Sequence, residues 1–203
     1  MYPIHLKKDL AKLADGDYCY FCLAPNPRKI ITPDQIQFHC LQCNKTDGLK
    51  LRLDNRTKTV WHREQMQHFT IGVLLRNVAT RKFLLMKKRT FPQVIDNVAG
   101  HVTIDETPEQ TLLRETAQET GFTLEKYKLL WEGLSENDLC RRGAPHHYWY
   151  IFYSEFQGTP TPDLQEVAYF KEYSWEEILA EKMLNPAIKN IIAGFSTSLL
   201  ELP

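Results

Sequence analysis

Apolar and polar positions change their spacing along the chain, and these changes mark the predicted elements. The first stretch carries Leu6, Leu10 and Leu13 at i, i+4 and i+7 spacing, which predicts a short amphipathic helix. From residue 69 the pattern becomes strand-like. Two apolar runs, Phe69–Leu75 and Lys82–Lys87, are joined by a polar turn and predict a β-hairpin.

Strands and helices continue to alternate in the second half of the chain. The predicted strands are Lys128–Glu132, His147–Glu155 and Ala168–Tyr173, and the predicted helices are Trp175–Glu181 and Pro186–Leu200. Ser174, with Glu177 three residues later, forms a capping box that starts the first of these helices. Helices set among strands predict an α/β (α+β, mixed-sheet) domain.

The best specified helix lies between Thr107 and Gly121. Thr107 is the expected N-cap, Pro108 occupies the first helical position, and Gln110 completes a capping box. Gly121 is a natural stop, because glycine readily adopts the left-handed conformation that ends helices.

The two faces of this helix differ in chemistry. Its apolar side, which we expect to pack on the sheet, is formed by Leu112, Leu113, Thr116, Ala117 and Thr120. Its other side carries Thr111, Arg114, Glu115, Gln118 and Glu119. Carboxylates gathered on one face repel each other unless a cation lies among them, which points to a divalent metal and phosphate chemistry. On spacing alone, a solvated face with ordinary Arg–Glu pairs is the alternative.

The order of residues from Gly100 to Phe122 resembles a known motif. Gly100, Glu106, Arg114-Glu115, Glu119 and Gly121-Phe122 stand in the order and spacing of the Nudix box, written GX5EX7REUXEEXGU. The resemblance implies a Nudix-type α/β/α sandwich over residues 66–203. It also implies hydrolysis of a nucleoside diphosphate linked to another moiety, with Mg²⁺ or Mn²⁺.

The resemblance also implies roles for single residues. Glu115 and Glu119 are expected to be metal ligands, with Glu115 assisting the attacking water; Arg114 is expected to orient a carboxylate, and the carbonyl near Gly100 to approach the metal. Gln118 stands where the family usually has a further metal-binding glutamate. Its amide oxygen can still coordinate a cation, but the lost negative charge predicts weaker metal binding.

Residues outside the box extend the expected site. Glu166 is the candidate for a further metal-binding carboxylate, and Lys87 and Arg89 are candidates for binding substrate phosphates. For Glu166 the equal alternative is a surface glutamate before a strand. For Lys87 and Arg89 the equal alternative is a solvated strand end. His146 and His147, at the start of an aromatic strand, are interpreted as surface or structural residues rather than catalytic ones.

The cysteines form a second motif. Cys19, Cys22, Cys40 and Cys43 make two CxxC pairs whose spacing predicts a zinc ribbon with four thiolate ligands. Disulfides or unrelated thiols are the alternatives, and disulfides are disfavoured in a cytosolic chain. Cys140 stands alone beside a pair of arginines and is interpreted as an incidental thiol.

Composition restricts the partners and the organisation. Among 203 residues, Lys+Arg and Asp+Glu are equal at 25 each, so no global charge attracts nucleic acid or an anionic membrane. The scattered basic residues of the ribbon do not favour nucleic acid. No apolar run predicts a signal peptide or a membrane span, so we expect a cytoplasmic protein. The expected organisation is residues 1–50 with the ribbon, a connector at 51–65, and the Nudix domain at 66–203.

The leading hypothesis is therefore a Nudix pyrophosphohydrolase that acts on a small-molecule nucleotide such as ADP-ribose or FAD. The SQPWPFPxS signature of NADH pyrophosphatases does not follow Phe122. Gln118 motivates a second hypothesis, a Nudix-fold binding or regulatory module with weakened catalysis. Isoprenoid diphosphate isomerases share the fold, but their cysteine motif is missing from VIDNVAGHV. Dimers are frequent among similar enzymes, so a homodimer is one expectation.

Overall fold

The computed structural model describes residues 2–161 and 165–195. Its helices are α1 (Lys7–Leu10), α2 (Pro108–Thr120), α3 (Trp175–Ala180) and α4 (Pro186–Ile192). Its strands are β1 (Gly16–Cys19), β2 (Arg28–Ile31), β3 (Ile36–His39), β4 (Thr46–Asp47), β5 (Lys50–Leu53), β6 (Thr59–His62), β7 (Gln65–Asn77), β8 (Phe83–Lys88), β9 (Ile95–Asp96), β10 (Val98–His101), β11 (Tyr127–Ser135), β12 (His146–Phe156) and β13 (Val167–Tyr173).

The largest sheet has eight strands and is mixed. Its main order is β11-β12-β7-β8-β13, with β6 and β10 also paired to β7 and β9 paired to β8. β12 and β7 run parallel, and the other pairs in this sheet are antiparallel. The long β7 therefore contacts strands from every part of the domain, and it brings residues distant in sequence to one place.

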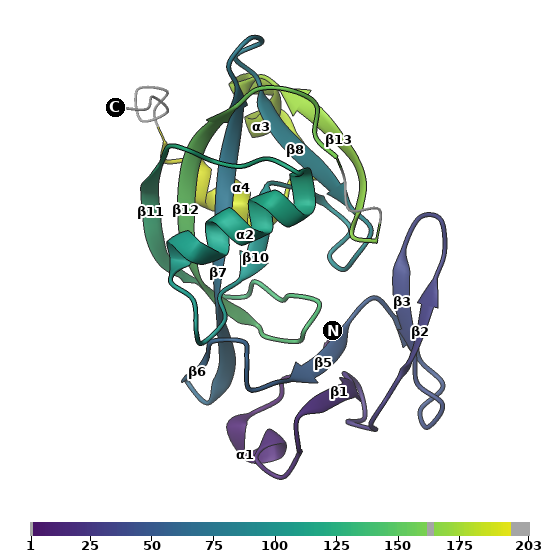
Figure 1. Ribbon diagram of the computed structural model, residues 1–203. Coiled ribbons are helices and arrows are strands. Elements are labelled where there is room, and N and C mark those ends of the chain that lie inside the picture. The colour runs from purple at the N-terminus through teal and green to yellow at the C-terminus, as the bar shows by residue number, and fades with distance from the viewer. Residues whose placement is uncertain (1, 162–164, 196–203) are drawn as a thin grey trace.

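Helices cover both faces of this sheet. Ile71, Val73 and Leu75 of β7 pack with Leu112 of α2 on one face. Leu74 points the other way, into the core beneath α3 and α4, because successive side chains of a strand alternate. Figure 1 shows α2 across the front of the sheet with α3 and α4 behind it. This three-layer α+β arrangement confirms the predicted fold class.

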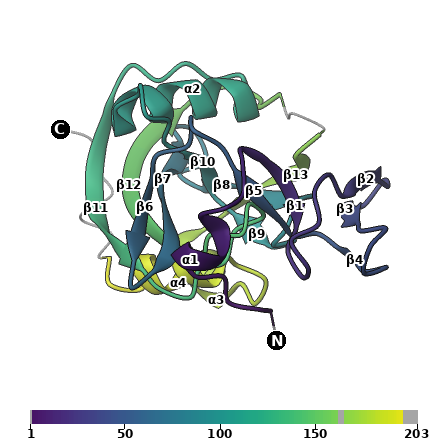
Figure 2. The ribbon, with the colours of Figure 1, turned by 90° about the horizontal axis from the view of Figure 1, so that it is seen from below.

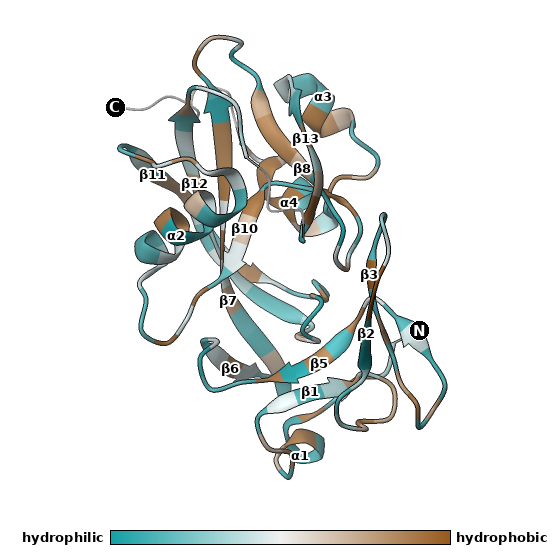
Figure 3. Cartoon of the chain, turned by 45° about the vertical axis from the view of Figure 1, so that its right-hand side comes forward, coloured by the Kyte–Doolittle hydropathy of each residue, from teal (hydrophilic) through white to brown (hydrophobic). Residues whose placement is uncertain are grey.

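The N-terminal part forms two small sheets beside the main domain (Figure 3). β1 pairs with β5, and β2, β3 and β4 form a three-stranded sheet. Tyr20 and Leu51 share a core with Met66 of β7 and Ala144 of the loop after β11. β6, within the expected connector at 51–65, pairs with β7 and lies next to it in Figure 2. The small sheets are thus packed onto the large domain through apolar contacts.

Several predicted elements are confirmed, and the first one is shorter than expected. The hairpin of β7 and β8 forms as predicted. The N-terminal helix has only four residues, because Leu6 instead forms a bridge with Gln65 of β7; an isolated short helix has little stability of its own. The expected tail helix ends at Ile192 as α4, and residues 196–200 of that prediction lie outside the described residues.

Within the described ranges, none of the helices has the length and apolar character that crossing a membrane requires.

Candidate active site

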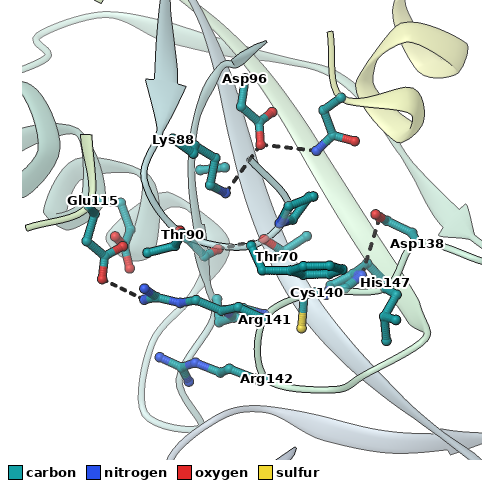
Figure 4. Close-up of a pocket in the computed structure, with 18 of the residues that line it drawn as sticks. Thr70, Lys88, Thr90, Asp96, Glu115, Asp138, Cys140, Arg141, Arg142 and His147 are labelled. Carbon is teal, nitrogen blue, oxygen red and sulfur yellow. Dashed lines mark hydrogen bonds and ion pairs between the residues drawn. The ribbon is translucent and has the colours of Figure 1, made fainter. Parts of the chain in front are cut away.

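A polar pocket lies where α2 and β10 meet the loop between β11 and β12 (Figure 4). Side chains of α2, of β10 and of this loop are among those that line it. The ionisable residues among them are Lys88, Asp96, His101, Glu115, Glu119, Asp138, Cys140, Arg141, Arg142, His147 and Glu166. Acidic and basic groups therefore face one pocket, as a site for a charged ligand requires.

Local signals fix α2, which carries the glutamates of this pocket. The Thr107 side chain accepts a hydrogen bond from the backbone N–H of Gln110, and the Gln110 side-chain Oε1 accepts one from the backbone N–H of Thr107 at 2.8 Å. Gly121 ends the helix with φ of 77°, in the left-handed region. The predicted boundaries are confirmed, and they place Glu115 and Glu119 one turn apart.

The predicted division of α2 into faces is partly wrong. Its buried residues are Thr111, Leu112, Thr116, Glu119 and Thr120. Leu113, expected in the core, is 38% exposed, and Ala117 is exposed as well. The helix is rotated so that Glu119 meets β10, where its Oε2 accepts a hydrogen bond from the backbone N–H of Ala99 at 3.2 Å. This contact with the backbone offsets part of the cost of burying a carboxylate.

Gly100 lets the Glu115 side chain lie against the backbone of β10. A Cβ atom at this position would overlap the carboxyl group of Glu115. The Gly100 carbonyl accepts a hydrogen bond from Thr70 Oγ1 at 2.8 Å, which fixes its direction. The glycine of the motif is thus required by close approach rather than by backbone conformation.

The two glutamates lie in an environment that disfavours their negative charge. Burial raises the pKa of the Glu115 carboxyl, although Arg114 opposes this shift. Burial also raises the pKa of Glu119 well above its usual value, and repulsion by Glu115 and Glu166 adds to the shift against the attraction of Lys88. A divalent cation would relieve this repulsion. The hard carboxylate and carbonyl oxygens are the donors that Mg²⁺ and Mn²⁺ prefer, so these residues fit such a metal.

Arg114 forms hydrogen bonds with two carboxylates, those of Glu106 and Glu115. Its Nε and Nη2 donate to Glu106 at 2.6 and 2.8 Å, and its Nη1 donates to Glu115 Oε1 at 2.5 Å. The Arg114 guanidinium lowers the pKa of the Glu106 carboxyl to about 2. Gln118 is exposed, does not line the pocket, and accepts a bond from Arg114 Nη1 at 3.2 Å. Glu106 is therefore the anchor of Arg114, while Gln118 lies at the rim of this network.

The remaining predicted residues lie in different places. Glu166 lines the pocket and pairs with Arg141 Nη2 at 2.6 Å; the carboxylate oxygens of Glu115, Glu119 and Glu166 do not form a three-ligand cluster in the described chain. Lys87 Nζ donates to the carbonyl of Gln93 and Arg89 Nη2 to that of Thr32, and neither lines the pocket. The cations that do line it are Lys88, Arg141 and Arg142.

The four ribbon cysteines meet at one point, with all sulfurs within 4.8 Å of one another. The Cys19–Cys43 and Cys22–Cys40 sulfurs are each 3.6 Å apart. Tetrahedral zinc with a zinc–sulfur distance of about 2.3 Å places its sulfurs about 3.8 Å apart. Backbone N–H groups also point at the Cys19 sulfur. The donor set and its spacing fit a structural zinc ion.

A second cluster was missed by the sequence analysis. His68, His101, Cys140 and His147 come from four separate segments, and their donor atoms also lie within 4.8 Å of one another. Cys140 is therefore not an incidental thiol. Burial alone would raise the pKa of its thiol, but the neighbouring histidines, His147 foremost, hold that pKa well below its usual value. No sequence spacing indicates this cluster, because it is assembled by strand pairing.

Comparison with known proteins adds to this geometry. Residues 66–195 match the family described as NUDIX domain. The MutT protein from Methanosarcina mazei Go1 is similar over 66% of this chain and 96% of its own, at 20% identity and TM-score 0.57. DR0079 from Deinococcus radiodurans is similar over 68% of this chain and 97% of its own, at 15% identity and TM-score 0.54. The NUDIX domain of Shewanella oneidensis NrtR, complexed with ADP ribose, is similar over 62% of this chain and 84% of its own, at 18% identity and TM-score 0.52. A search of curated proteins gave no match.

Proposed function

The chain belongs to the Nudix family, and from this premise we propose that it is a Mg²⁺- or Mn²⁺-dependent hydrolase of a nucleoside diphosphate linked to another moiety. One observation carries the proposal. Glu115 and Glu119 face a polar pocket in which their carboxyl pKa values are raised by burial, so a cation is needed to stabilise their charged forms. A solvated helix face would not bury these groups.

The two glutamates of α2 and Arg114 would have distinct roles in this reaction. Glu115 and Glu119 would hold the metal, together with the carbonyl near Gly100, and the bound metal would lower the pKa of water and offset phosphate charge. Arg114 fixes the Glu115 carboxylate through its contacts to Glu106 and Glu115. Glu115, whose pKa is raised, is suited to accept the proton of the attacking water.

The reaction replaces one phosphorus–oxygen bond by another. The water oxygen bonds to one phosphorus, the bond from that phosphorus to the bridging oxygen breaks, and two phosphate monoesters result. The proton taken up by Glu115 passes to solvent. Lys88, Arg141 and Arg142 are the pocket cations that would contact the diphosphate, in place of the expected Lys87 and Arg89.

The proposal is tested with a panel of nucleoside diphosphate compounds. Purified protein with Mg²⁺ or Mn²⁺ is expected to release a nucleoside monophosphate from at least one member, with ADP-ribose and FAD tested first. ADP ribose is the ligand in the similar NrtR structure, which makes it a reasonable starting compound. Tight binding without release across the whole panel, with both metals, would instead support a binding module.

Gln118 is the observation that favours a binding module with weakened catalysis. Replacing it with glutamate restores the negative charge that the family usually has at this position, and so tests this alternative. Gln118→Glu is expected to lower the Mg²⁺ concentration for half-maximal rate roughly three- to tenfold, because it adds a carboxylate near the metal. The measurement is the initial rate against Mg²⁺ concentration. Ala117→Glu adds the same charge at the preceding exposed position. An equal effect of both substitutions would mean that only general charge matters and that position 118 has no special role.

The ribbon is proposed to bind one structural zinc ion. The small sheets bury few apolar side chains around the cysteines, so metal binding would supply much of their folding free energy. The shared core with Met66 and Ala144 connects the ribbon to the loop that carries Arg141 and Arg142. The ribbon is therefore proposed to support one wall of the pocket.

A further inference from the structure

The cluster of His68, His101, Cys140 and His147 is assembled by the pairing of three strands and one loop. His68 on β7 lies directly opposite His147 on the parallel strand β12. His101 ends β10, which pairs with β7 two residues further on. Cys140 is brought to them by a turn in which its N–H donates to Ala144 O and its carbonyl accepts from Gly143 N–H. The four side chains therefore converge through the fold itself.

The donor atoms have the type and spacing of a zinc site. All four lie within 4.8 Å of one another, and Cys140 Sγ is 3.8 Å from His68 Nδ1. In tetrahedral zinc sites with sulfur and nitrogen ligands, the donor atoms are about 3.3 to 3.8 Å apart. One thiolate and three imidazoles are a donor set that favours zinc over magnesium.

Burial makes the cluster costly without a cation at its centre. His68 and His147 are 1% and 3% exposed. Nε2 of His101 is buried among these groups without a hydrogen bond of ordinary geometry in the described chain. Buried polar nitrogen atoms nearly always have a partner, and a metal ion between the four groups would supply it.

Asp138 supplies the outer contact that metal-binding histidines usually have. Its Oδ2 lies 3.3 Å from His147 Nδ1 and accepts a hydrogen bond from Trp149 Nε1 at 2.7 Å (Figure 4). This contact does not have ordinary hydrogen-bond geometry in the described chain, but a carboxylate beside a ring nitrogen is the outer group of carboxylate–histidine–zinc sites. A divalent cation, the Cys140 thiolate and the Asp138 carboxylate together have no net charge, which suits a buried position.

We propose that His68, His101, Cys140 and His147 form a second zinc site, within the Nudix domain and next to the hydrolytic pocket. Four protein ligands leave no position for water, so the site is structural rather than catalytic. It ties the loop between β11 and β12 to β7, β10 and β12. This inference goes beyond the proposed hydrolysis, because it concerns a different metal and different residues.

The position of the site explains what it would stabilise. Arg141 and Arg142 directly follow Cys140 and line the pocket. Their carbonyls accept hydrogen bonds from the N–H groups of Lys50 and Arg52 at 3.2 and 2.9 Å. Zinc at Cys140 would therefore fix both the pocket arginines and the contact between this loop and β5.

A reactive cysteine is the competing interpretation. Cys140, His147 and Asp138 lie in the order of a Cys–His–Asp catalytic group. A nucleophile needs one histidine as its base, whereas three converge here, and His68 is buried behind the pocket. A reactive thiol would be alkylated rapidly in the purified protein, whereas a zinc-bound thiolate enclosed by three ligands would react slowly.

The test is the zinc content of the purified full-length chain by mass spectrometry. The wild type is expected to contain about two zinc ions per chain, and Cys140→Ser about one, because three remaining ligands bind zinc weakly. His146→Asn is the matched control: it changes the neighbouring histidine, which contacts Gln65 outside the cluster, and is expected to retain both ions. Circular dichroism checks that each variant is folded.

Cobalt substitution keeps the proposal testable if Cys140→Ser does not fold. Co²⁺ in the wild type is expected to show absorption from a site with one thiolate in addition to that of the four-thiolate ribbon. His101→Asn should remove only the first signal. The proposal is overturned if the zinc content of the wild type is the same as that of both cluster variants, or if Cys140 is alkylated rapidly in metal-replete protein. Each result is read from bound metal or alkylation, and neither depends on finding the nucleotide substrate.

Discussion

Replacing Glu119 with glutamine is expected to reduce kcat/KM for the nucleotide substrate by ~10³-fold or more, because a metal-held negative charge contributes several kcal/mol to the transition state. Glutamine keeps the size of the side chain and the oxygen that accepts from Ala99 N–H. The loss would therefore reflect charge rather than packing. The measurement is the steady-state rate at saturating Mg²⁺.

Glu109→Gln is the matched control for this substitution. It makes the same chemical change in the first turn of α2, at an exposed position away from the pocket, and the rate is expected to stay within about twofold of wild type. If Glu119→Gln retained more than a small fraction of the wild-type rate, Glu119 would not be a ligand of the catalytic metal.

Glu119→Gln is expected to lower activity but to raise the stability of the metal-free protein. Burial and neighbouring carboxylates raise the pKa of Glu119 above its usual value of 4.5. A carboxyl whose pKa is raised in the folded state weakens the fold at any pH above its unfolded value. In metal-free protein, Glu119→Gln is therefore expected to raise Tm at pH 7. The gain should vanish below pH 4.5, where the carboxyl is protonated in both states.

Replacing Cys22 with serine is expected to release the ribbon zinc and unfold the small sheets, because zinc binding to such sites is worth on the order of 10 kcal/mol or more. The measurements are zinc content and hydrogen exchange of the backbone amides of β1 to β5. The exchange of β7 near Met66 is expected to increase as well, since this residue shares a core with the ribbon side.

Leu41→Ser is the control for the ribbon substitution. Leu41 lies between Cys40 and Cys43 of the second CxxC pair and is 84% exposed, so it makes little contact with the rest of the protein. It is expected to retain zinc and normal exchange. Unchanged zinc content in Cys22→Ser would show that the four cysteines do not bind the ion together.

Elements with local signals could be predicted from the sequence. The ends of α2 are set by hydrogen bonds between near neighbours, at Thr107 and Gln110 at its start and at Gly121 at its end. Each CxxC pair likewise places two sulfurs close together within one turn of the chain. The order of residues in the box also indicated that Glu115 and Glu119 belong together. These features depend on spacing along the chain, which the sequence displays directly.

Features that depend on packing between distant segments could not be predicted. Leu113 is more apolar than Thr116, yet Thr116 is the buried residue, because the rotation of α2 is set by the sheet and by the contact of Glu119 with Ala99. Lys87 and Arg89 donate to the carbonyls of Gln93 and Thr32, whereas Lys88 between them lines the pocket, because successive side chains of an extended segment point to opposite sides.

By itself the sequence determined the family, the helix that carries the glutamates and the four cysteines of the ribbon, since each of these is written in short-range spacing. Only the tertiary structure decided that Cys140 meets His68, His101 and His147. That contact requires β7 to pair with both β10 and β12, and strand pairing joins residues whose separation along the chain carries no pattern. The tertiary structure also decided that Arg141 and Arg142 line the pocket, rather than the expected Lys87 and Arg89.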